Sequence, residues 1–183
     1  SLRYGISRGV FSNEAGLGTL AVLHGPAEHT TPWEQGMWAM FEVFVDTIVI
    51  CTLTALVILC AGMESGLDGA ALTSFCFTKI LGSFGGFLVS ASMAAFAFAT
   101  IVGWYYIGRQ MFSYLAEYLS PGANTEYLYT ILYLLAVWLG CICRLELVWL
   151  MSDLVNGLMA YPNLLSLWLL AGHVQFPKIK AEK

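Results

Sequence analysis

The run from Gly36 to Gly62 most constrains what this chain can fold into. It is long and apolar, with Glu42 and Asp46 as its charged side chains. A helix needs about 20 mostly apolar residues to cross a bilayer. Composition agrees, because 11% of the residues are charged, against about 25% in soluble domains. The chain is therefore predicted to be an all-α, polytopic membrane protein. Its net charge of −4 argues against a nucleic-acid partner.

Three further apolar stretches are predicted to span the membrane, at residues 85–115, 126–143 and 145–173. Pro162 interrupts the last stretch. The part after Pro162 is too short to cross a bilayer alone, so 145–173 is predicted to be one kinked span. The segment 63–84 is predicted to be a connection.

The C-terminal tail, residues 174–183, carries Lys178, Lys180 and Lys183. Cytoplasmic segments beside membrane spans are enriched in lysine and arginine. The tail is therefore predicted to lie in the cytoplasm.

Polar side chains within the predicted spans indicate where function can reside, because ionisable groups at membrane depth must face protein or water. Glu42 and Asp46 share one face of the first span. A second stripe on the last span contains Glu146, Asp153, Asn156 and Asn163. Two interpretations stay open for both stripes: hydrogen bonds between helices, or a direct part in an ion or substrate path.

The span at 85–115 is rich in small residues. Ala95, Ala99 and Gly103 repeat every four residues and would allow another backbone to approach closely. Thr100 and Trp104 form the neighbouring row, which can line a small polar pocket. The alternative is that the Thr100 hydroxyl bonds back to its own helix and Trp104 only packs.

The opening stretch combines charged residues with glycines. Its Gly16-x-Gly18 pattern follows no predicted strand and is too weak for a nucleotide loop. The chain is predicted to unwind near Gly9–Ser12 and to restart as a half-helix at about Asn13. Broken helices of this kind hold substrates and ions in many transporters. The alternative is a loop at the membrane surface.

Several long motifs, in order along nearly the whole chain, resemble the sodium:alanine symporter family (alanine or glycine:cation symporters). They read RGVFSNEAGLG, QGMWAMFEVFVDTIVICTLTALVIL, SGLDGAALTSF, AFAFATIVGW and DLVNGLMAYPNLLSL. The resemblance implies a five-plus-five inverted-repeat (leucine-transporter-like) fold. It also implies symport of alanine, glycine or a similar small amino acid, coupled to sodium ions or protons, across a bacterial or archaeal plasma membrane, with no other cofactor and no enzymatic activity.

The resemblance also implies a numbering of the core helices. The chain would begin within core helix six (1–20) and continue with helices seven (36–62), eight (85–115), nine (126–143) and ten (145–173). Ile6, Val10, Thr100 and Trp104 would then contact the substrate. The Thr100 side chain and the Ala99 backbone would contact the cation. Many members of the family have serine where this chain has Ala99, so one sodium ligand would be lost.

Members of the family are much longer, and the resemblance implies that a first repeat is missing, to be supplied in cis or in trans. Arg8 and Glu14 are expected to find their interaction partners in that repeat. One rival interpretation is a membrane scaffold or receptor without transport activity. Another is a metalloenzyme built on His24, Glu28 and His29, although a spacing of five between the two histidines fits no single helix face.

Overall fold

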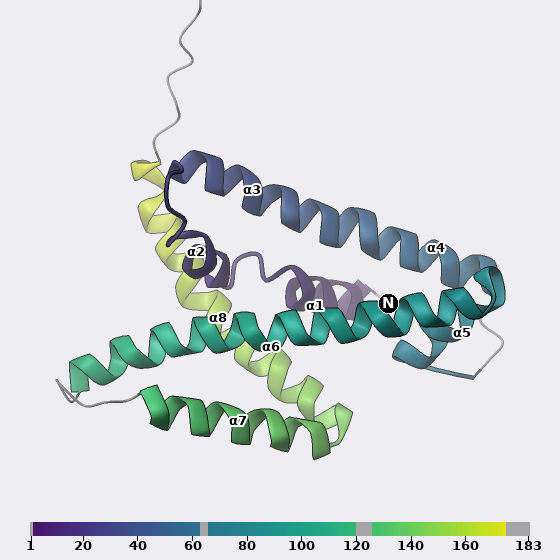
Figure 1. Ribbon diagram of the computed structural model, residues 1–183. Helices are drawn as coiled ribbons and strands as arrows, with labels where there is room; N and C mark the ends of the chain where they lie inside the picture. Colours follow the sequence, from purple (N-terminus) through teal and green to yellow (C-terminus); the bar gives the residue numbers. More distant parts are fainter. Residues whose placement is uncertain (1, 63–65, 120–125, 175–183) are drawn as a thin grey trace, which may run out of the picture. The chain divides into compact units, whose positions relative to one another are not determined.

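The computed structural model describes residues 2–62, 66–119 and 126–174, and every regular element in these ranges is helical. The all-α prediction is therefore confirmed. In chain order (Figure 1) the elements are α1 (Leu2–Asn13), α2 (Thr19–His24), α3 (Pro32–Phe44), the π-helical η1 (Val45–Ile50), α4 (Cys51–Ala61), α5 (Gly69–Leu81), α6 (Ser83–Leu119), α7 (Glu126–Ile142), α8 (Leu145–Leu170) and the 3₁₀ turn η2 (Ala171–His173).

The helices belong to two compact units. One contains the residues up to Phe44 and those from Tyr127 onward, and the other contains Val45–Glu126. Of the tail predicted to be cytoplasmic, 174–183, residues 175–183 lie outside the described residues.

Three helical runs in the described ranges are long and apolar enough to cross a membrane: Pro32–Ala61, Ser83–Leu119 and Leu145–His173. They contain most of the stretches predicted at 36–62, 85–115 and 145–173. The fourth predicted span, 126–143, corresponds to α7. This helix is apolar but has 17 residues, slightly fewer than the about 20 that a bilayer requires.

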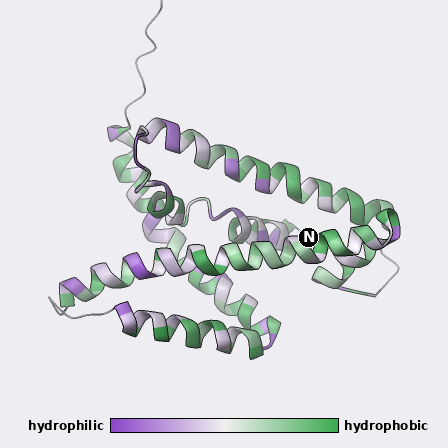
Figure 2. Ribbon diagram, viewed as in Figure 1, coloured by the Kyte–Doolittle hydropathy of each residue, from purple (hydrophilic) through white to green (hydrophobic). Residues whose placement is uncertain are grey.

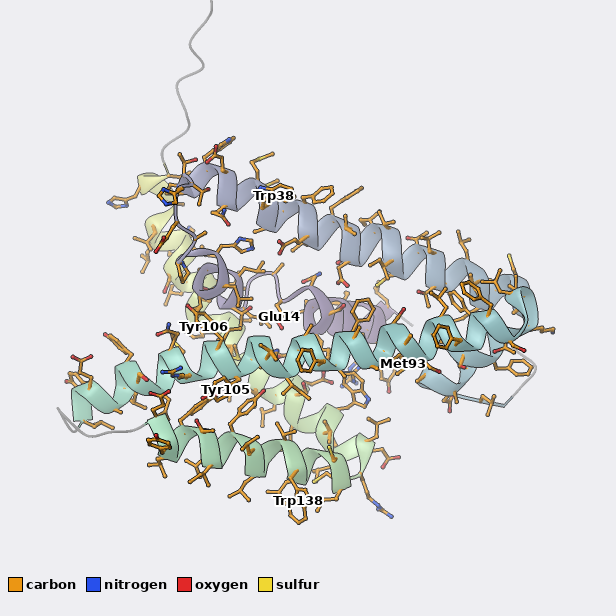
Figure 3. The ribbon with its side chains drawn as sticks, viewed as in Figure 1. Glu14, Trp38, Met93, Tyr105, Tyr106 and Trp138 are labelled. Carbon is orange, nitrogen blue, oxygen red and sulfur yellow. The ribbon has the colours of Figure 1, made fainter. Side chains whose placement is uncertain are left out.

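Apolar side chains are distributed around these helices rather than along one stripe (Figure 2). Phe96 is 61% exposed and Leu158 is 67% exposed. The labelled tryptophans, Trp38 on α3 and Trp138 on α7, project from their helices (Figure 3). A helix that is apolar all round belongs in a membrane or in the core of a larger protein. The exposed surface of this chain is therefore suited to lipid or to further helices.

The segment 63–84 contains a helix that the sequence analysis treated as part of a connection. This helix, α5, has 13 residues, too few to span a bilayer. Glycines in left-handed or extended positive-φ conformations stand at both ends, Gly69 at +58° and Gly82 at +66°. Lys79 Nζ donates to the Ala61 carbonyl oxygen at 2.7 Å and so caps the end of α4.

Close packing holds α5 against the start of α6. Cys76 of α5 is fully buried. Gly85 lies so close to the Phe77 carbonyl that a Cβ there would overlap it, and a Cβ on Gly86 would lie 2.7 Å from Thr78 Oγ1. The two glycines therefore allow the backbones to approach, as small residues do between membrane helices.

Candidate functional site

The first two helices are separated by a break that lies further along the chain than predicted. α1 continues through Gly9–Ser12 and ends at Asn13. Glu14, Gly16 and Gly18 follow with φ values of +53°, +87° and +92°. Right-handed helix cannot continue through such left-handed conformations. The prediction of unwinding at Gly9–Ser12 was wrong, because glycine permits a break without requiring one.

Asn13 was predicted to start the second half-helix, and this prediction was also wrong. Its Oδ1 accepts a hydrogen bond from Ala15 N at 2.9 Å, a local turn that favours ending a helix. The second half-helix, α2, begins instead at Thr19. Thr19 is only 2% exposed.

α8 holds the break in place. Asn163 Nδ2 donates to the Gly16 carbonyl oxygen at 2.8 Å. A Cβ on Gly18 would lie 3.0 Å from Asn163 Oδ1, so this backbone passes directly beside the amide. The side chain of Asn163 thus satisfies a carbonyl that the broken helix leaves without a helical partner. For Asn163 the structure shows a hydrogen bond from α8 to the non-helical backbone between α1 and α2.

A second polar contact joins α1 to α8. Asp153 accepts hydrogen bonds from Ser7 Oγ at 2.8 Å and from Arg8 Nη1 at 3.1 Å. Arg8 Nη2 lies 3.4 Å from the other oxygen of Asp153. The guanidinium also stacks on Trp149, with its carbon 3.7 Å from the ring centroid, and Phe11 meets the same ring edge-on at 5.1 Å.

Arg8 was predicted to find its interaction partner in a missing first repeat. The contact with Asp153 changes this expectation. In the structure Arg8 has its counter-charge within this chain. The carboxylate of Asp153 neutralises the guanidinium, and the aromatic face of Trp149 adds a cation–π contact. For Asp153 the structure shows hydrogen bonds between helices α1 and α8.

The other polar residues of the spans differ in their surroundings. Glu42 of α3 reaches His24 of α2. Asp46 is partly buried in η1, a π-helical segment that the sequence pattern did not predict. Such segments are frequent at functional sites. Asn156 is half-buried and Glu146 is exposed on α8.

The predicted substrate and cation residues lie in both units. Ile6, which is 61% exposed, and the half-buried Val10 are one turn apart on α1. Ala99 and Thr100 are exposed and Trp104 is half-buried on α6. Since α1 and α6 belong to different units, a pocket shared by these residues stays a prediction.

The Thr100 hydroxyl does not follow the alternative that the sequence analysis left open. Thr54 and Thr78 donate to the carbonyl oxygens four residues earlier, at 2.9 and 2.7 Å. No such bond is made by Thr100 to any described residue.

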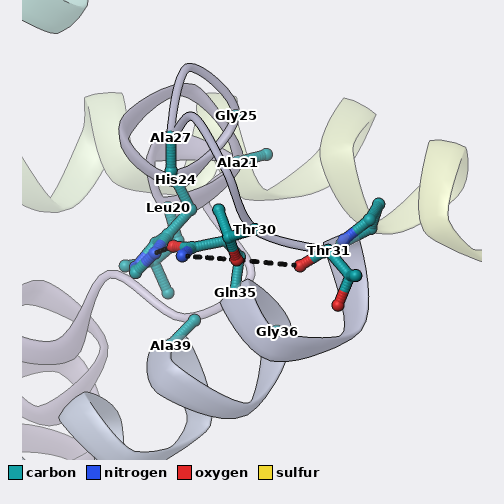
Figure 4. A pocket seen from close by; sticks show the side chains of 11 residues that line it. Leu20, Ala21, His24, Gly25, Ala27, Thr30, Thr31, Gln35, Gly36 and Ala39 are labelled. Carbon is teal, nitrogen blue, oxygen red and sulfur yellow. Dashed lines mark hydrogen bonds between the residues drawn. The ribbon is translucent and has the colours of Figure 1, made fainter.

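A pocket of about 390 Å³ lies between α2 and α3, in the first unit. Leu20, Ala21 and Ala39 provide apolar walls, and His24, Gln35 and Thr30 provide polar groups (Figure 4). The sequence motifs did not predict this pocket. Its only sequence signal is the capping box Thr31-x-x-Glu34 at the start of α3.

The capping box is complete in the structure. Thr31 N donates to Glu34 Oε2 at 2.8 Å, and Glu34 N donates to Thr31 Oγ1 at 3.2 Å. Two of the amide groups that a helix start leaves unpaired are thereby satisfied. The capping box fixes the start of α3 and with it one wall of the pocket.

His24 lies in this pocket, and its two ring nitrogens contact Gln35 and Glu42. Its Nδ1 is 2.8 Å from Gln35 Oε1, and its Nε2 is 3.3 Å from Glu42 Oε2. Glu28 and His29 lie on the exposed turn between α2 and α3. In residues 2–62, 66–119 and 126–174 no three histidine, cysteine or acidic side chains are grouped to hold a metal ion.

Comparisons with known proteins agree with the sequence motifs. The family model described as "Sodium:alanine symporter family" matches residues 1–179. The chain is 39% identical over 95% of its length to "Sodium/alanine symporter AgcS" of Methanococcus maripaludis. It is 34% identical over 93% to "Probable sodium/glutamine symporter GlnT" of Bacillus subtilis, and 27% identical over 93% to "Sodium/proton-dependent alanine carrier protein" of Bacillus sp. strain PS3.

The chain spans 38%, 35% and 42% of the lengths of these three relatives. No solved structure matches it. The family match nevertheless covers almost every residue, from α1 to beyond the apolar helix α8. From its motifs, its apolar helices and this match, the chain belongs to the sodium:alanine symporter family.

Proposed function

We propose that this chain is the C-terminal portion of a cation-coupled symporter for alanine, glycine or a similar small amino acid. The observation that carries the proposal is the family match over residues 1–179. The name of one relative gives sodium and alanine, and the name of another gives alanine with sodium or protons. The glutamine named for another relative makes glutamine the competing substrate to test.

The proposed fold is the second half of a five-plus-five inverted repeat. The helix break at Glu14–Gly18 supports it, because non-helical backbone in a membrane protein is tolerated where it lines a cavity or is buried by protein. Asn163 buries part of this break. The first repeat would come from the same longer chain or from a separate one, and it would cover the apolar surfaces that are exposed here. The protein would lie in a bacterial or archaeal plasma membrane with its C-terminus in the cytoplasm.

In this proposal Ile6 and Val10 contact the apolar side chain of the substrate, while Thr100 and Trp104 complete the pocket. The Thr100 hydroxyl and the Ala99 carbonyl would supply oxygen atoms to the cation. The exposure of Thr100 and the absence of a bond from its hydroxyl to the described residues support this role. The small side chain of Ala99 leaves room beside Thr100 for a neighbouring helix.

Uptake of labelled alanine into proteoliposomes, with and without a sodium gradient or a proton gradient, tests the proposal. The experiment uses the complete gene product that contains this chain, with unlabelled glycine and glutamine as competitors. Alanine and glycine are expected to compete more strongly than glutamine. Thr100→Ala is expected to reduce uptake about tenfold or more, since a hydrogen bond to a charged group contributes about 1.5–3 kcal/mol.

Thr100→Ser should restore most of the uptake because it keeps the hydroxyl. Thr54→Ala is the matched control, since that hydroxyl is already bonded to the Ile50 carbonyl. Equal uptake by the Thr100→Ala and Thr54→Ala variants would refute the site. Binding of alanine without accumulation under either gradient would instead indicate a receptor or scaffold.

A further inference from the structure

The side chain of His24 connects the two walls of the α2–α3 pocket. Nδ1 lies 2.8 Å from Gln35 Oε1 and Nε2 lies 3.3 Å from Glu42 Oε2. His24 is 18% exposed at its side chain, whereas Glu42 is 55% exposed. Both contacts run from α2 to α3. The positions of the protons on this ring therefore decide how the two helices attract each other.

The direction of the hydrogen bonds can be followed from the capping box. Thr30 Oγ1 lies 3.2 Å from Glu34 Oε2 and 3.4 Å from the Thr31 carbonyl oxygen. The carbonyl oxygen and the ionised carboxylate of Glu34 can accept hydrogen bonds but cannot donate them. The single hydroxyl proton of Thr30 therefore points toward these two atoms. The oxygen of Thr30 must then accept from its third neighbour, Gln35 Nε2, at 3.2 Å.

This donation fixes the orientation of the Gln35 amide. With Nε2 directed at Thr30, the carbonyl Oε1 faces His24 Nδ1 (Figure 4). A carbonyl oxygen accepts only, so Nδ1 must carry a proton.

The reversed amide would make a worse network. Thr30 would have to donate its only proton to the Gln35 carbonyl. Its oxygen would then lie 3.2 Å from Glu34 Oε2 with no proton between the two. Two acceptors at that distance repel each other, because neither has a proton to offer the other. The stable orientation of the Gln35 amide therefore has Nε2 toward Thr30 and Oε1 toward His24.

On the other side of the ring, Nε2 faces the carboxylate of Glu42. If His24 is neutral and Nδ1 holds its proton, Nε2 is a bare acceptor that faces a carboxylate oxygen at 3.3 Å. We infer that His24 and Glu42 share one additional proton, which makes this pair a proton-binding site that joins α2 to α3 at the pocket.

Other ionisable groups near the ring do not replace Glu42. Glu34 reaches His24 only through Thr30 and Gln35. Glu28 and His29 are exposed on the intervening turn and make no bond to the ring in the described part of the chain. On α8, Asp153 is paired with Arg8. Loss of the shared proton would leave two acceptors facing each other and would weaken the attraction between α2 and α3.

Nitrogen-15 NMR of the full protein, labelled at histidine and held in detergent micelles, tests the inference near neutral pH. Free imidazole changes its charge in this range. The expected result for His24 is a proton on both ring nitrogens, or a proton on Nδ1 together with an infrared band of a protonated Glu42 carboxyl. His24→Gln assigns the signal, and the exposed His29 serves as the internal reference.

Glu42→Gln should leave the ring neutral with its proton on Nδ1, because an amide N–H can donate to Nε2. It should also abolish any protonated-carboxyl band. Glu28→Gln is the matched control and should leave the His24 signals unchanged. A wild-type ring with a bare Nδ1 and a proton on Nε2 would overturn the inference, because it would show that the Gln35 amide is reversed. A neutral Nδ1–H ring beside an ionised Glu42 would overturn it as well.

The inference does not rest on the proposed transport function, since bound protons are observed without transport. If the shared proton is found but no gradient drives uptake, the transport proposal fails and the proton site stands. If uptake occurs but the ring carries no shared proton, the proton site fails and transport stands.

Discussion

A double-mutant cycle on Arg8 and Asp153 tests how strongly α8 holds the first half of the broken helix. The variants are Arg8→Gln, Asp153→Asn and the two together. Asparagine keeps an oxygen that can accept from Ser7 Oγ, now at 2.8 Å, but it loses the charge that faces the guanidinium. The cycle therefore isolates the ion pair from the neighbouring hydroxyl bond.

The magnitude follows from the geometry and the exposure of the pair. Arg8 Nη1 lies 3.1 Å from Asp153 Oδ1, with side-chain exposures of 32% and 43%. Solvent screens a pair of this exposure, so the coupling should be about 0.5–1 kcal/mol. Asp153→Ala also removes the acceptor for Ser7 and should cost about 1 kcal/mol more. Arg8 keeps its cation–π contact with Trp149 in both Asp153 variants.

Thermal or denaturant unfolding in detergent micelles measures these differences. A change of 1 kcal/mol shifts Tm by about 2–4 °C for a chain of this size. Glu146→Gln is the control, because this exposed residue of α8 has no hydrogen bond or ion pair to the described residues. A coupling below about 0.3 kcal/mol, or equal effects of Asp153→Asn and Asp153→Ala, would refute the reasoning.

Two further predictions concern the packing and capping of helices. Gly85→Ala should destabilise the second unit by about 1–3 kcal/mol or more, because its Cβ would overlap the Phe77 carbonyl. Gly103→Ala has open space around its Cβ and should be neutral or stabilise by about 0.5–1 kcal/mol in the same unfolding measurement; equal losses for both would contradict the close approach of α5 to α6. Thr31→Ala removes the acceptor for Glu34 N and should cost about 1 kcal/mol. A Tm unchanged by that substitution would show that the capping box does not hold the start of α3.

The helices could be predicted from the sequence because their causes are local or repeat along the chain. Long apolar runs exclude most other structures in a bilayer, where every backbone polar group must be satisfied within the segment. The ends of such runs were less well predicted. Residues 83–84 extend α6, and α5, with 13 residues, lies in a segment that was predicted to be a connection. Packing against α6 through Gly85, rather than length, identifies α5 as part of the folded unit.

The break after α1 shows the limit of local reasoning. Four glycines permit an interruption of the helix, and the sequence alone does not rank them. They are Gly5, Gly9, Gly16 and Gly18. The structure places it at Glu14–Gly18, where Asn163 of α8 can satisfy the Gly16 carbonyl. A residue 147 positions away therefore contributes to the choice.

The sequence by itself determined the membrane character of this protein, its helical class and its family, because composition, apolar run length and ordered motifs are properties of the chain alone. Only the tertiary structure decided which polar groups meet. Arg8 pairs with Asp153 across 145 positions, and His24 meets Glu42 across 18. Hydrogen bonds and ion pairs act over a few ångströms, so they depend on which helix faces come together.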